Sequence, residues 1–287
     1  MKPALFDYHL PSTVDEAVGL LSTVDGAMIL AGGQSLIPAM NMRLASPAAL
    51  IDIQRIPGLA SVKVENGMIR VGAMVRHRSL ELDEVAHRAN PLIREVMAHV
   101  AHVPIRHRGT VVGSLCHADA AAEMPLVLVL TGGSVVARSP SGKRVIEATD
   151  YFTFHMTTSR RPDEMIVEAR FPALPQGAGH AFEEFTRRHG DYAIAAVGAI
   201  LTKGGDGSIT EISLVACGIS SKPVRLAAAE AALKGKPLAP ETLEKAARSA
   251  AEAVTADDDL HATAAYRRHL VGVLVKRAVQ KAAARAS

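Results

Sequence analysis

The sequence predicts an α+β fold, in which helices mix with antiparallel hairpins and do not alternate regularly with parallel strands. Three pairs of short apolar segments flank turn residues, as in β-hairpins. They lie at residues 62–71, 134–147 and 193–217. Apolar residues at helical spacing dominate the last part of the chain. These helices are expected at residues 225–233, 240–253 and 264–284.

The first 56 residues are expected to form a small unit of their own. A helix should begin near Val14, because either Ser12 or Thr13 can cap it, with a carboxylate three residues later in both registers. Short apolar runs predict strands around this helix, followed by a turn or short helix. The strands are expected at residues 6–8, 27–30 and 50–53, and the turn or short helix at 38–44.

The clearest local signal in the middle of the chain is Asn66-Gly67, which stands between two short apolar segments and predicts a type I′ turn. Three further elements are expected from apolar spacing. They are a helix at residues 92–103, a helix or buried segment at 125–131 and a strand at 165–171.

Residues 172–177, which contain two prolines and end in glycine, mark the best domain boundary. The sequence therefore predicts two domains. The first would span residues 1–175, with subdomains of about 1–56 and 57–175, and the second residues 176–287.

Composition excludes several classes of function. At 287 residues the chain can hold two domains, and 48% hydrophobic with 21% charged residues is typical of a soluble globular protein. Aromatic residues make up only 3%, which leaves little for stacking on nucleic-acid bases, so no nucleic-acid partner is expected. No apolar run approaches the roughly 18 residues of a membrane span, and no signal peptide is evident. We expect a cytoplasmic protein without a transmembrane segment.

The stretch Ala31-Gly32-Gly33-Gln34-Ser35-Leu36 follows an apolar segment and organises the rest of the prediction. Glycines can adopt positive φ and let backbone N–H groups approach an anion, while Gln34 and Ser35 add side-chain donors. Such a loop suits a phosphate group. A tight turn with a polar tip has the same sequence features, and the loop alone does not decide between them.

A second stretch, from Arg108 to Asp119, again combines glycines, hydroxyl groups and a carboxylate. Two such loops suit the two halves of one dinucleotide. Neither the Gly-x-Gly-x-x-Gly pattern of a Rossmann site nor a P-loop is present, so a dinucleotide would have to be bound in another way.

Three segments together resemble the signatures of one family, the FAD-binding medium subunits of the molybdenum hydroxylases. They are Ala-Gly-Gly-Gln-Ser-Leu-Ile-Pro at 31–38, Gly-Thr-Val-Val-Gly-Ser-Leu at 109–115 and Arg-Arg-His-Gly-Asp-Tyr-Ala at 187–193. The family includes carbon monoxide dehydrogenase, xanthine dehydrogenase and bacterial N-heterocycle hydroxylases. The resemblance covers essentially the whole chain. It implies a two-subdomain FAD-binding fold of the vanillyl-alcohol-oxidase type, followed by a smaller α+β domain with an antiparallel sheet and helices.

The resemblance also implies which residues bind FAD. Ala31 would belong to the site, and Gly32 to Leu36 would contact the pyrophosphate. The other side of the pyrophosphate would be approached by Thr110, Gly113 and Ser114. Among the remaining matches, Asp119 and Glu123 would contact the adenosine portion, and Ile166 would lie on the adenine side. Val100 would lie near the flavin ring, and Tyr192 would lie beside the isoalloxazine. For Asp119 and Glu123 a purely structural role at a helix N-terminus is the alternative.

Three positions depart from the family pattern. Val112 stands where relatives often have glycine, and its Cβ disfavours positive φ, so the backbone path there is open to question. Ala120 replaces a frequent proline, and Glu184 occupies a place where some relatives carry a lysine near the cofactor. No metal site is expected, because the spacing of His102, His107 and His117 fits no standard set of ligands.

The resemblance implies an electron-transfer role without a catalytic side chain in this chain. A large partner subunit would carry a molybdopterin cofactor and a small one two [2Fe–2S] clusters, in a dimer of three-subunit units. Electrons would pass through FAD to NAD, a quinone or oxygen. The substrate would be an N-heterocycle, or carbon monoxide. Two alternatives stay open at this point: a stand-alone FAD-dependent oxidoreductase of the same fold, and a cofactor-free assembly or scaffold protein.

One further feature is a cluster of positive residues near the C-terminus. A solvent-exposed helix face and a partner-docking face are both compatible with it. The cluster consists of Arg267, Arg268, Lys276, Arg277, Lys281 and Arg285.

Overall fold

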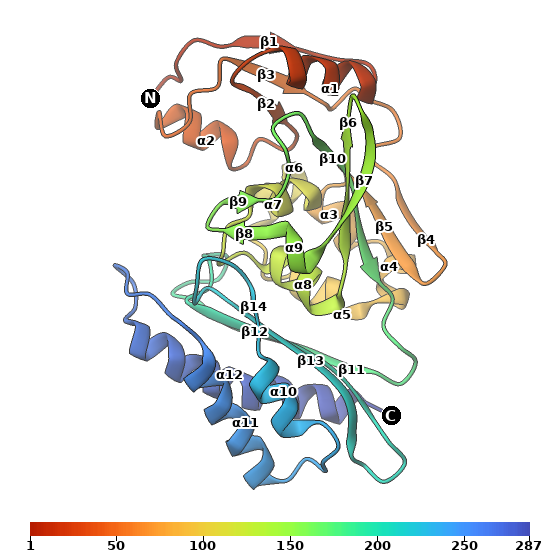
Figure 1. Ribbon diagram of the computed structural model, residues 1–287, viewed down its shortest axis with the longest axis vertical. Coiled ribbons are helices and arrows are strands. Elements are labelled where there is room, and N and C mark those ends of the chain that lie inside the picture. The colour runs from red at the N-terminus through yellow and green to blue at the C-terminus, as the bar shows by residue number, and fades with distance from the viewer.

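The computed structural model describes residues 1–287, which form three parts stacked along the long axis of the molecule (Figure 1). The N-terminal part is a three-stranded parallel sheet in the order β1-β3-β2, with two helices. Its elements are β1 (Asp7–His9), α1 (Val14–Thr23), β2 (Ala27–Leu30), α2 (Leu36–Asn41) and β3 (Ala49–Asp52). The strands and the helix expected in this region are confirmed to within one residue.

The start of α1 is a capping box. The Thr13 hydroxyl accepts a hydrogen bond from the Glu16 backbone N–H at 3.1 Å, and the Glu16 carboxylate accepts one from the Ser12 N–H at 2.8 Å. Of the two capping residues considered, Thr13 is thus the N-cap. The first contact satisfies an N–H group that an isolated helix would leave without a partner, and the second ties the residue before the cap to the first turn.

The middle part contains a five-stranded antiparallel sheet in the order β4-β5-β10-β6-β7 and most of the short helices. Its elements are β4 (Val62–Glu65), β5 (Met68–Gly72), α3 (His77–Glu81), α4 (Glu84–Ala89), α5 (Pro91–Met97), α6 (Val103–Arg108), α7 (Val111–His117), α8 (Glu123–Thr131), β6 (Ser134–Ser139), β7 (Gly142–Glu147), α9 (Ala148–Tyr151), β8 (Phe152–Phe154), β9 (Thr157–Thr158) and β10 (Met165–Pro172). The type I′ turn is confirmed, because Asn66 and Gly67 have φ values of 52° and 72°.

Two predictions for the middle part were wrong. The single helix at 92–103 is two helices, because α5 ends at Met97 and α6 begins at Val103 with Pro104 in its first turn. A proline fits the first turn of a helix and disrupts its interior, so Pro104 carried the signal for the break. The second glycine stretch is largely helix α7, in which Val112 is helical and buried. Val112 does not have a positive φ, so its Cβ does not obstruct the backbone path there.

The C-terminal part is a four-stranded antiparallel sheet in the order β11-β12-β13-β14, covered by three helices. Its elements are β11 (Gly179–Phe185), β12 (Ala195–Lys203), β13 (Ile209–Cys217), β14 (Val224–Arg225), α10 (Ala227–Leu233), α11 (Pro240–Ala253) and α12 (Ala264–Arg285). The hairpin and the three helices were expected, whereas β11 was not predicted. No helix of the protein is both long enough and apolar enough to cross a membrane.

The C-terminal sheet packs on both faces. One face and the helices α10 to α12 enclose a core of 29 buried residues. The other face packs against α8, whose apolar residues belong to the larger core of 42 residues. The approach is close at Gly198, where a Cβ would lie 2.5 Å from Leu130 Cδ2. Helix α8 is apolar on all sides because it is buried between the middle and C-terminal parts.

Three of the six basic residues near the C-terminus are held in contacts within the molecule. Arg267 is buried and donates to the carbonyl of Ile194 at 2.6 Å. Glu95 of α5 lies 2.7 Å from Lys281 and 2.6 Å from Arg285, so α12 is tied to the middle part by ion pairs. For Arg267 both interpretations of the cluster were wrong, because its side chain is buried, whereas Lys281 and Arg285 are partly exposed and ion-paired to Glu95.

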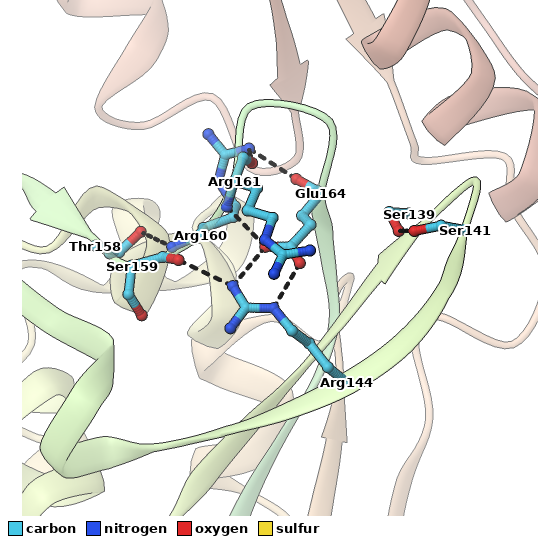
Figure 2. Close-up of polar contacts among 8 residues, drawn as sticks. All are labelled: Ser139, Ser141, Arg144, Thr158, Ser159, Arg160, Arg161 and Glu164. Carbon is cyan, nitrogen blue, oxygen red and sulfur yellow. Dashed lines mark hydrogen bonds and ion pairs between the residues drawn. The ribbon is translucent and has the colours of Figure 1, made fainter.

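A second ionic contact fastens the loop before β10 (Figure 2). The Glu164 side chain is only 3% exposed, and its two oxygens accept hydrogen bonds from Arg144 at 2.6 and 2.8 Å. The backbone N–H of Arg161 donates to the same carboxylate at 2.7 Å. Arg144 also donates to the carbonyl of Ser159. Hydrogen bonding to Arg144 lowers the pKa of Glu164, and burial opposes this effect only in part.

We expect Glu164→Gln to lower the free energy of unfolding by about 1–3 kcal/mol at neutral pH, because charge-assisted hydrogen bonds to a buried carboxylate are lost. A carboxyl group with a lowered pKa stabilises the fold above its unfolded pKa near 4.5, and this contribution disappears as the pH falls through the folded value. Urea unfolding of both proteins should therefore give curves that converge in acid. The control is Glu65→Gln, which removes an exposed ion pair with Arg70 and should cost less than about 1 kcal/mol. A stability difference that persists in acid would show that the ionised Glu164 carboxylate is not the source of this stability.

Candidate functional site

The two glycine segments meet at the boundary between the N-terminal and middle parts. A Cβ on Gly32 would lie 2.5 Å from the carbonyl oxygen of Arg108, 2.7 Å from the Cα of Gly109 and 3.0 Å from the nitrogen of Thr110. Only glycine allows the backbones to approach this closely. The two loops that were predicted to share one site are thus in direct contact, and the shared site itself stays a prediction.

The first loop turns from β2 into α2 at Gly33. This residue has φ of +71°, in the left-handed region that favours glycine, and its carbonyl accepts from the N–H of Ile37 at 3.1 Å. The side chain of Gln34 donates back to the carbonyl of Gly32 at 3.3 Å. Ser35 precedes α2 without capping it through its side chain, so its hydroxyl is not used by the helix.

A cavity of about 370 Å³ lies beside the first loop, and we call it the loop cavity. Its walls contain two arginines from the middle part. The lining residues are Leu30, Ala31, Gly32, Gly33, Gln34, Ile37, Pro38, Asn41, Asp52, Gln54, Arg76 and Arg108. The carboxylate of Asp52 is already engaged, because it accepts from the Tyr8 hydroxyl at 2.6 Å and from Gln54 Nε2 at 2.8 Å.

Arg76 and Arg108 add two positive charges to the loop cavity, which the carboxylate of Asp52 offsets in part. The guanidinium of Arg76 donates to the backbone carbonyl of Arg108, and neither arginine is ion-paired to a carboxylate. Burial lowers the pKa of Arg76, and the nearby charge of Arg108 lowers it further. Two unpaired cations next to a glycine loop are the arrangement expected for an anion site.

The segment just after β5 holds the second loop in place. The N–H of His77 donates to the carbonyl of Gly109 at 3.1 Å, and the N–H of Val111 donates to the carbonyl of Val75 at 3.1 Å. His77 is buried, and burial lowers its pKa to about 4, so its ring is neutral at physiological pH. Thr110 then caps α7, since its hydroxyl accepts from the Gly113 N–H at 3.1 Å.

A second cavity, of about 460 Å³, lies between the middle and C-terminal parts, and we call it the interdomain cavity. It is lined by Asp119, Ala120, Ala121, His155, Arg187, Gly190, Asp191, Tyr192, Ala193, Ile194, Gly218, Ile219, Ser220, Asp257, Asp259, His261 and Arg267. Two predicted site residues, Asp119 and Tyr192, are thus brought together from segments far apart in sequence. Asp119 accepts from the N–H of Ala121 at 2.8 Å, and the ring of Tyr192 is half-exposed.

Glu123 occupies an unusual position at the start of α8. The residue is only 4% exposed, and burial followed by the charge of Glu184 raises its pKa to about 8. A carboxylate at a helix N-terminus is normally stabilised in its charged form, but here burial dominates over the dipole. Glu123 does lie at the N-terminus of α8, as the structural alternative expected, but burial opposes its ionisation.

The remaining predicted site residues lie apart from both cavities. Val100 and Ile166 are buried in the larger core, the latter where β10 shifts its register against β6. Leu36 begins α2, whereas Gly113 and Ser114 lie within α7. Their contacts with a cofactor stay predictions. No group of three or more metal-binding side chains that would suit an ion is present.

Two residues of the loop cavity were missed from the sequence as binding residues. Arg108 directly precedes Gly109, so its position beside the glycine stretch was a usable signal. Arg76 lies 32 residues before Arg108 and has no local motif of its own. Only the pairing of residues 75–77 with 109–111 brings it to the site.

Comparisons with known proteins agree along the whole chain. A family model described as "FAD binding domain in molybdopterin dehydrogenase" matches residues 4–174, and one described as "CO dehydrogenase flavoprotein C-terminal domain" matches residues 180–282. The nicotine 6-hydroxylase medium subunit of Paenarthrobacter nicotinovorans is 39% identical, with 99% of this chain and 100% of that protein covered. The carbon monoxide dehydrogenase medium chain of Afipia carboxidovorans is 35% identical, with 100% and 99% covered.

A solved structure shows the same fold. One chain of the carbon monoxide dehydrogenase from Hydrogenophaga pseudoflava superimposes with a TM-score of 0.97 at 35% sequence identity. The match covers 100% of both chains. The predicted α+β architecture, with an FAD-binding fold followed by a smaller α+β unit, is confirmed.

The contact between the two loops leads to a stability prediction. Gly32→Ala should lower the free energy of unfolding by about 1–3 kcal/mol, because the new methyl group would overlap backbone atoms of Arg108 and Gly109 and force the two segments apart. Gly205→Ala is the matched control, since a Cβ there meets nothing within 4 Å. Chemical denaturation of the two variants measures the difference. Equal stability of Gly32→Ala and Gly205→Ala would show that the loops are not in tight contact.

Proposed function

Because the chain belongs to the family of FAD-binding medium subunits of molybdenum hydroxylases, we propose that it holds FAD between its two glycine segments and its interdomain cavity. The chain is an oxidoreductase subunit that transfers electrons through this cofactor. The large molybdenum-containing subunit and the small iron–sulfur subunit of such a complex are its partners. The electron-transfer role is thus inferred from the family, and the FAD-binding site is inferred from the residues described above.

The observation that carries the FAD assignment is the charge of the loop cavity. The diphosphate of FAD is a dianion, and the cavity offers two guanidinium groups, Arg76 and Arg108, that are not ion-paired to carboxylates. Positive φ at Gly33 turns the first loop beside them. Arginine recognises phosphate oxygens well because its N–H groups form a planar fork. The residues present therefore fit a pyrophosphate, as the family resemblance implied.

The interdomain cavity suits the flavin end of the cofactor. Tyr192 was expected beside the isoalloxazine, and Asp119 lines the same cavity. We therefore assign Asp119 to this end of FAD in place of the adenosine portion. Thr110 and Ser114 lie on the segment that runs from the loop cavity to Asp119, through α7. Ala31 and Leu36 flank the first loop, and we retain Val100 and Ile166 as more distant contacts.

Bound FAD supplies a redox centre that accepts electrons singly and releases them in pairs. The side chains of this chain bind and orient the cofactor and determine the charge around it. Tyr192 keeps its hydroxyl proton at neutral pH, because desolvation and the charges of Asp119 and Glu123 raise its pKa to about 12. No side chain here is required as an acid, base or nucleophile toward the organic substrate.

The assembly and the external acceptor follow the same family relation. We propose a dimer of heterotrimers, with a molybdopterin cofactor in the large subunit and two [2Fe–2S] clusters in the small one, and NAD, a quinone or oxygen as the acceptor. The cytoplasmic location expected from the sequence stays a prediction. An N-heterocycle is the favoured substrate class, because the relative named for nicotine is 39% identical, compared with 35% for the carbon monoxide medium chain.

Neither alternative function is favoured by these observations. A cofactor-free scaffold offers no reason for two arginines without ion-pair partners to line one cavity beside a glycine loop. A stand-alone oxidoreductase is not needed to explain a chain that matches medium subunits over their full length.

The first loop provides a direct test of the cofactor. Purified together with its partner subunits, the wild-type protein should show flavin absorbance and release FAD. Gly33→Val should lose the FAD and keep most of the fold, because a β-branched residue disfavours φ of +71° and its Cβ would crowd Ile37 at 3.2 Å. Gly67→Val is the control, with the same positive φ of +72° in a hairpin turn far from the loops. It should retain FAD. Stoichiometric flavin in Gly33→Val would rule out the first-loop assignment.

The arginine pair provides a second test. Arg108→Gln should weaken FAD binding roughly 10- to 100-fold, because a hydrogen bond to a charged group contributes about 1.5–3 kcal/mol. Arg108→Lys keeps the charge and should recover part of the affinity. Titration of the flavin-free protein with FAD measures both values. The control is Arg78→Gln, which breaks an ion pair with Glu81 and does not line the cavity. Unchanged affinity in Arg108→Gln would remove the arginine from the site.

A further inference from the structure

One buried arginine connects three walls of the interdomain cavity. Arg267 lies near the start of α12, and its side chain is only 8% exposed. Its Nη1 donates to the backbone carbonyl of Ile194 at 2.6 Å and to that of Gly218, and its Nη2 donates to Oδ2 of Asp259 at 2.5 Å. All four residues line the cavity. One guanidinium thus joins the segments before β12, after β13 and before α12.

The fourth wall of the cavity belongs to the middle part and is attached to this junction through Gly218. The N–H of Gly218 donates to the carbonyl of Ala120 at 2.9 Å. Gly218 has φ of +75°, and a Cβ there would lie 2.6 Å from the carbonyl oxygen of Ala193, so only glycine allows this approach. The middle part and the segment that carries Tyr192 are therefore both held against Gly218, whose own carbonyl is held by Arg267.

The burial of the Arg267 guanidinium is costly unless its charge is compensated by hydrogen bonds and an opposite charge. Here two backbone carbonyls and the carboxylate of Asp259 provide the compensation. The same carboxylate accepts from the N–H groups of His261 and Ala262 at 2.8 and 2.9 Å. Burial opposes the ionisation of Asp259, but the hydrogen bonds from these N–H groups and from Arg267 together lower its pKa to about 2. The pair is therefore charged at neutral pH, and all the contacts of the arginine go to the cavity wall.

The ring of Tyr192 depends on its backbone for its orientation. The residue is 54% exposed, so packing against the core holds the ring only in part. The backbone two residues further on is fixed at both of its polar groups. The N–H of Ile194 donates to the carbonyl of Phe185 at 2.9 Å, and the carbonyl of Ile194 accepts from Arg267. Arg267 thus fixes the position of the tyrosine through the main chain.

We propose that Arg267 is a positioning residue for the flavin, because it joins three walls of the interdomain cavity and thereby holds Tyr192 where its ring contacts the isoalloxazine. This inference rests on the proposed function, which assigns the flavin end of FAD to this cavity. Lysine replaces arginine only in part at this position. A single ammonium group lacks the planar fork of donors that reaches two carbonyls and a carboxylate at once.

A double-mutant cycle tests whether Arg267 acts through Tyr192. The flavin-free, full-length chain would be titrated with FAD. Arg267→Gln and Tyr192→Ala should each weaken FAD binding roughly 10-fold, the scale of a lost stacking contact, and the double variant should lose little more than either single one. Arg267→Lys should recover part of the affinity. The control is Arg268→Gln at the neighbouring, partly exposed position, which should bind FAD as the wild type does. Losses that multiply in the double variant, or unchanged affinity in Arg267→Gln, would overturn the proposal.

Asp259→Ala extends the cycle to a variant that leaves the buried guanidinium in place. The side chain of Asp259 is 48% exposed, so its removal perturbs the fold less than a substitution of Arg267. It should weaken FAD binding less than Arg267→Gln does, and again without multiplying the loss caused by Tyr192→Ala. If circular dichroism shows that Arg267→Gln does not fold, this variant decides. Multiplied losses in Asp259→Ala with Tyr192→Ala would then contradict the positioning role.

Flavin fluorescence provides a readout that a purely structural role would not change. A tyrosine in contact with the isoalloxazine quenches the excited flavin by electron transfer, so FAD bound to the wild-type chain should emit weakly. After free FAD is removed, Tyr192→Ala and Arg267→Gln should both show a long-lived emission from bound FAD, and Arg268→Gln should not. Full quenching in either of the first two variants would refute the positioning role. A wild-type protein that binds no FAD, alone or with its partner subunits, would refute the proposed function instead.

Discussion

The arrangement of the site depends on one steric constraint, the contact between the backbone at Gly32 and the backbone of Arg108 to Thr110. No side chain fits between these segments, so the N-terminal and middle parts close directly on each other. The second segment is in turn fastened by hydrogen bonds from residues 75–77. Through these contacts Arg76 and Arg108 come to line the same cavity as the first loop. A glycine, a short strand-like bridge and two arginines thereby meet at one cavity, which no single segment could form.

Helix α8 has a corresponding role at the junction between the middle and C-terminal parts. Its apolar side chains pack against β12 and β13, and this contact holds the C-terminal sheet against the middle part. The loop that enters this helix therefore lies at the interdomain cavity, with Asp119 in the cavity wall and Glu123 buried behind it. Ion pairs between Glu95 and the end of α12 reinforce the same junction from outside.

Charge is distributed unequally between the two cavities. The loop cavity contains guanidinium groups without carboxylate partners, which suits the diphosphate of a dinucleotide. The region around the interdomain cavity is rich in carboxyl groups, of which Glu123 is held in its protonated form by burial. The two cavities thus differ in charge, which supports the proposal that the diphosphate of FAD lies in the loop cavity.

The sequence by itself determined the features that depend on neighbouring residues. Caps, turns and apolar periodicity act over a few residues, so several elements were predictable from the sequence. They are the capped start of α1, the Asn66-Gly67 hairpin and the helices from Pro240 onward. The three family segments could likewise be recognised in the sequence itself. The tertiary structure alone decided the pairing of Arg76 with the glycine loops, the burial of Glu123 beside Glu184, and the use of Lys281 and Arg285 as ties to Glu95. Each of these joins segments distant in sequence. Their geometry and charge state follow from packing and burial, which local composition does not encode.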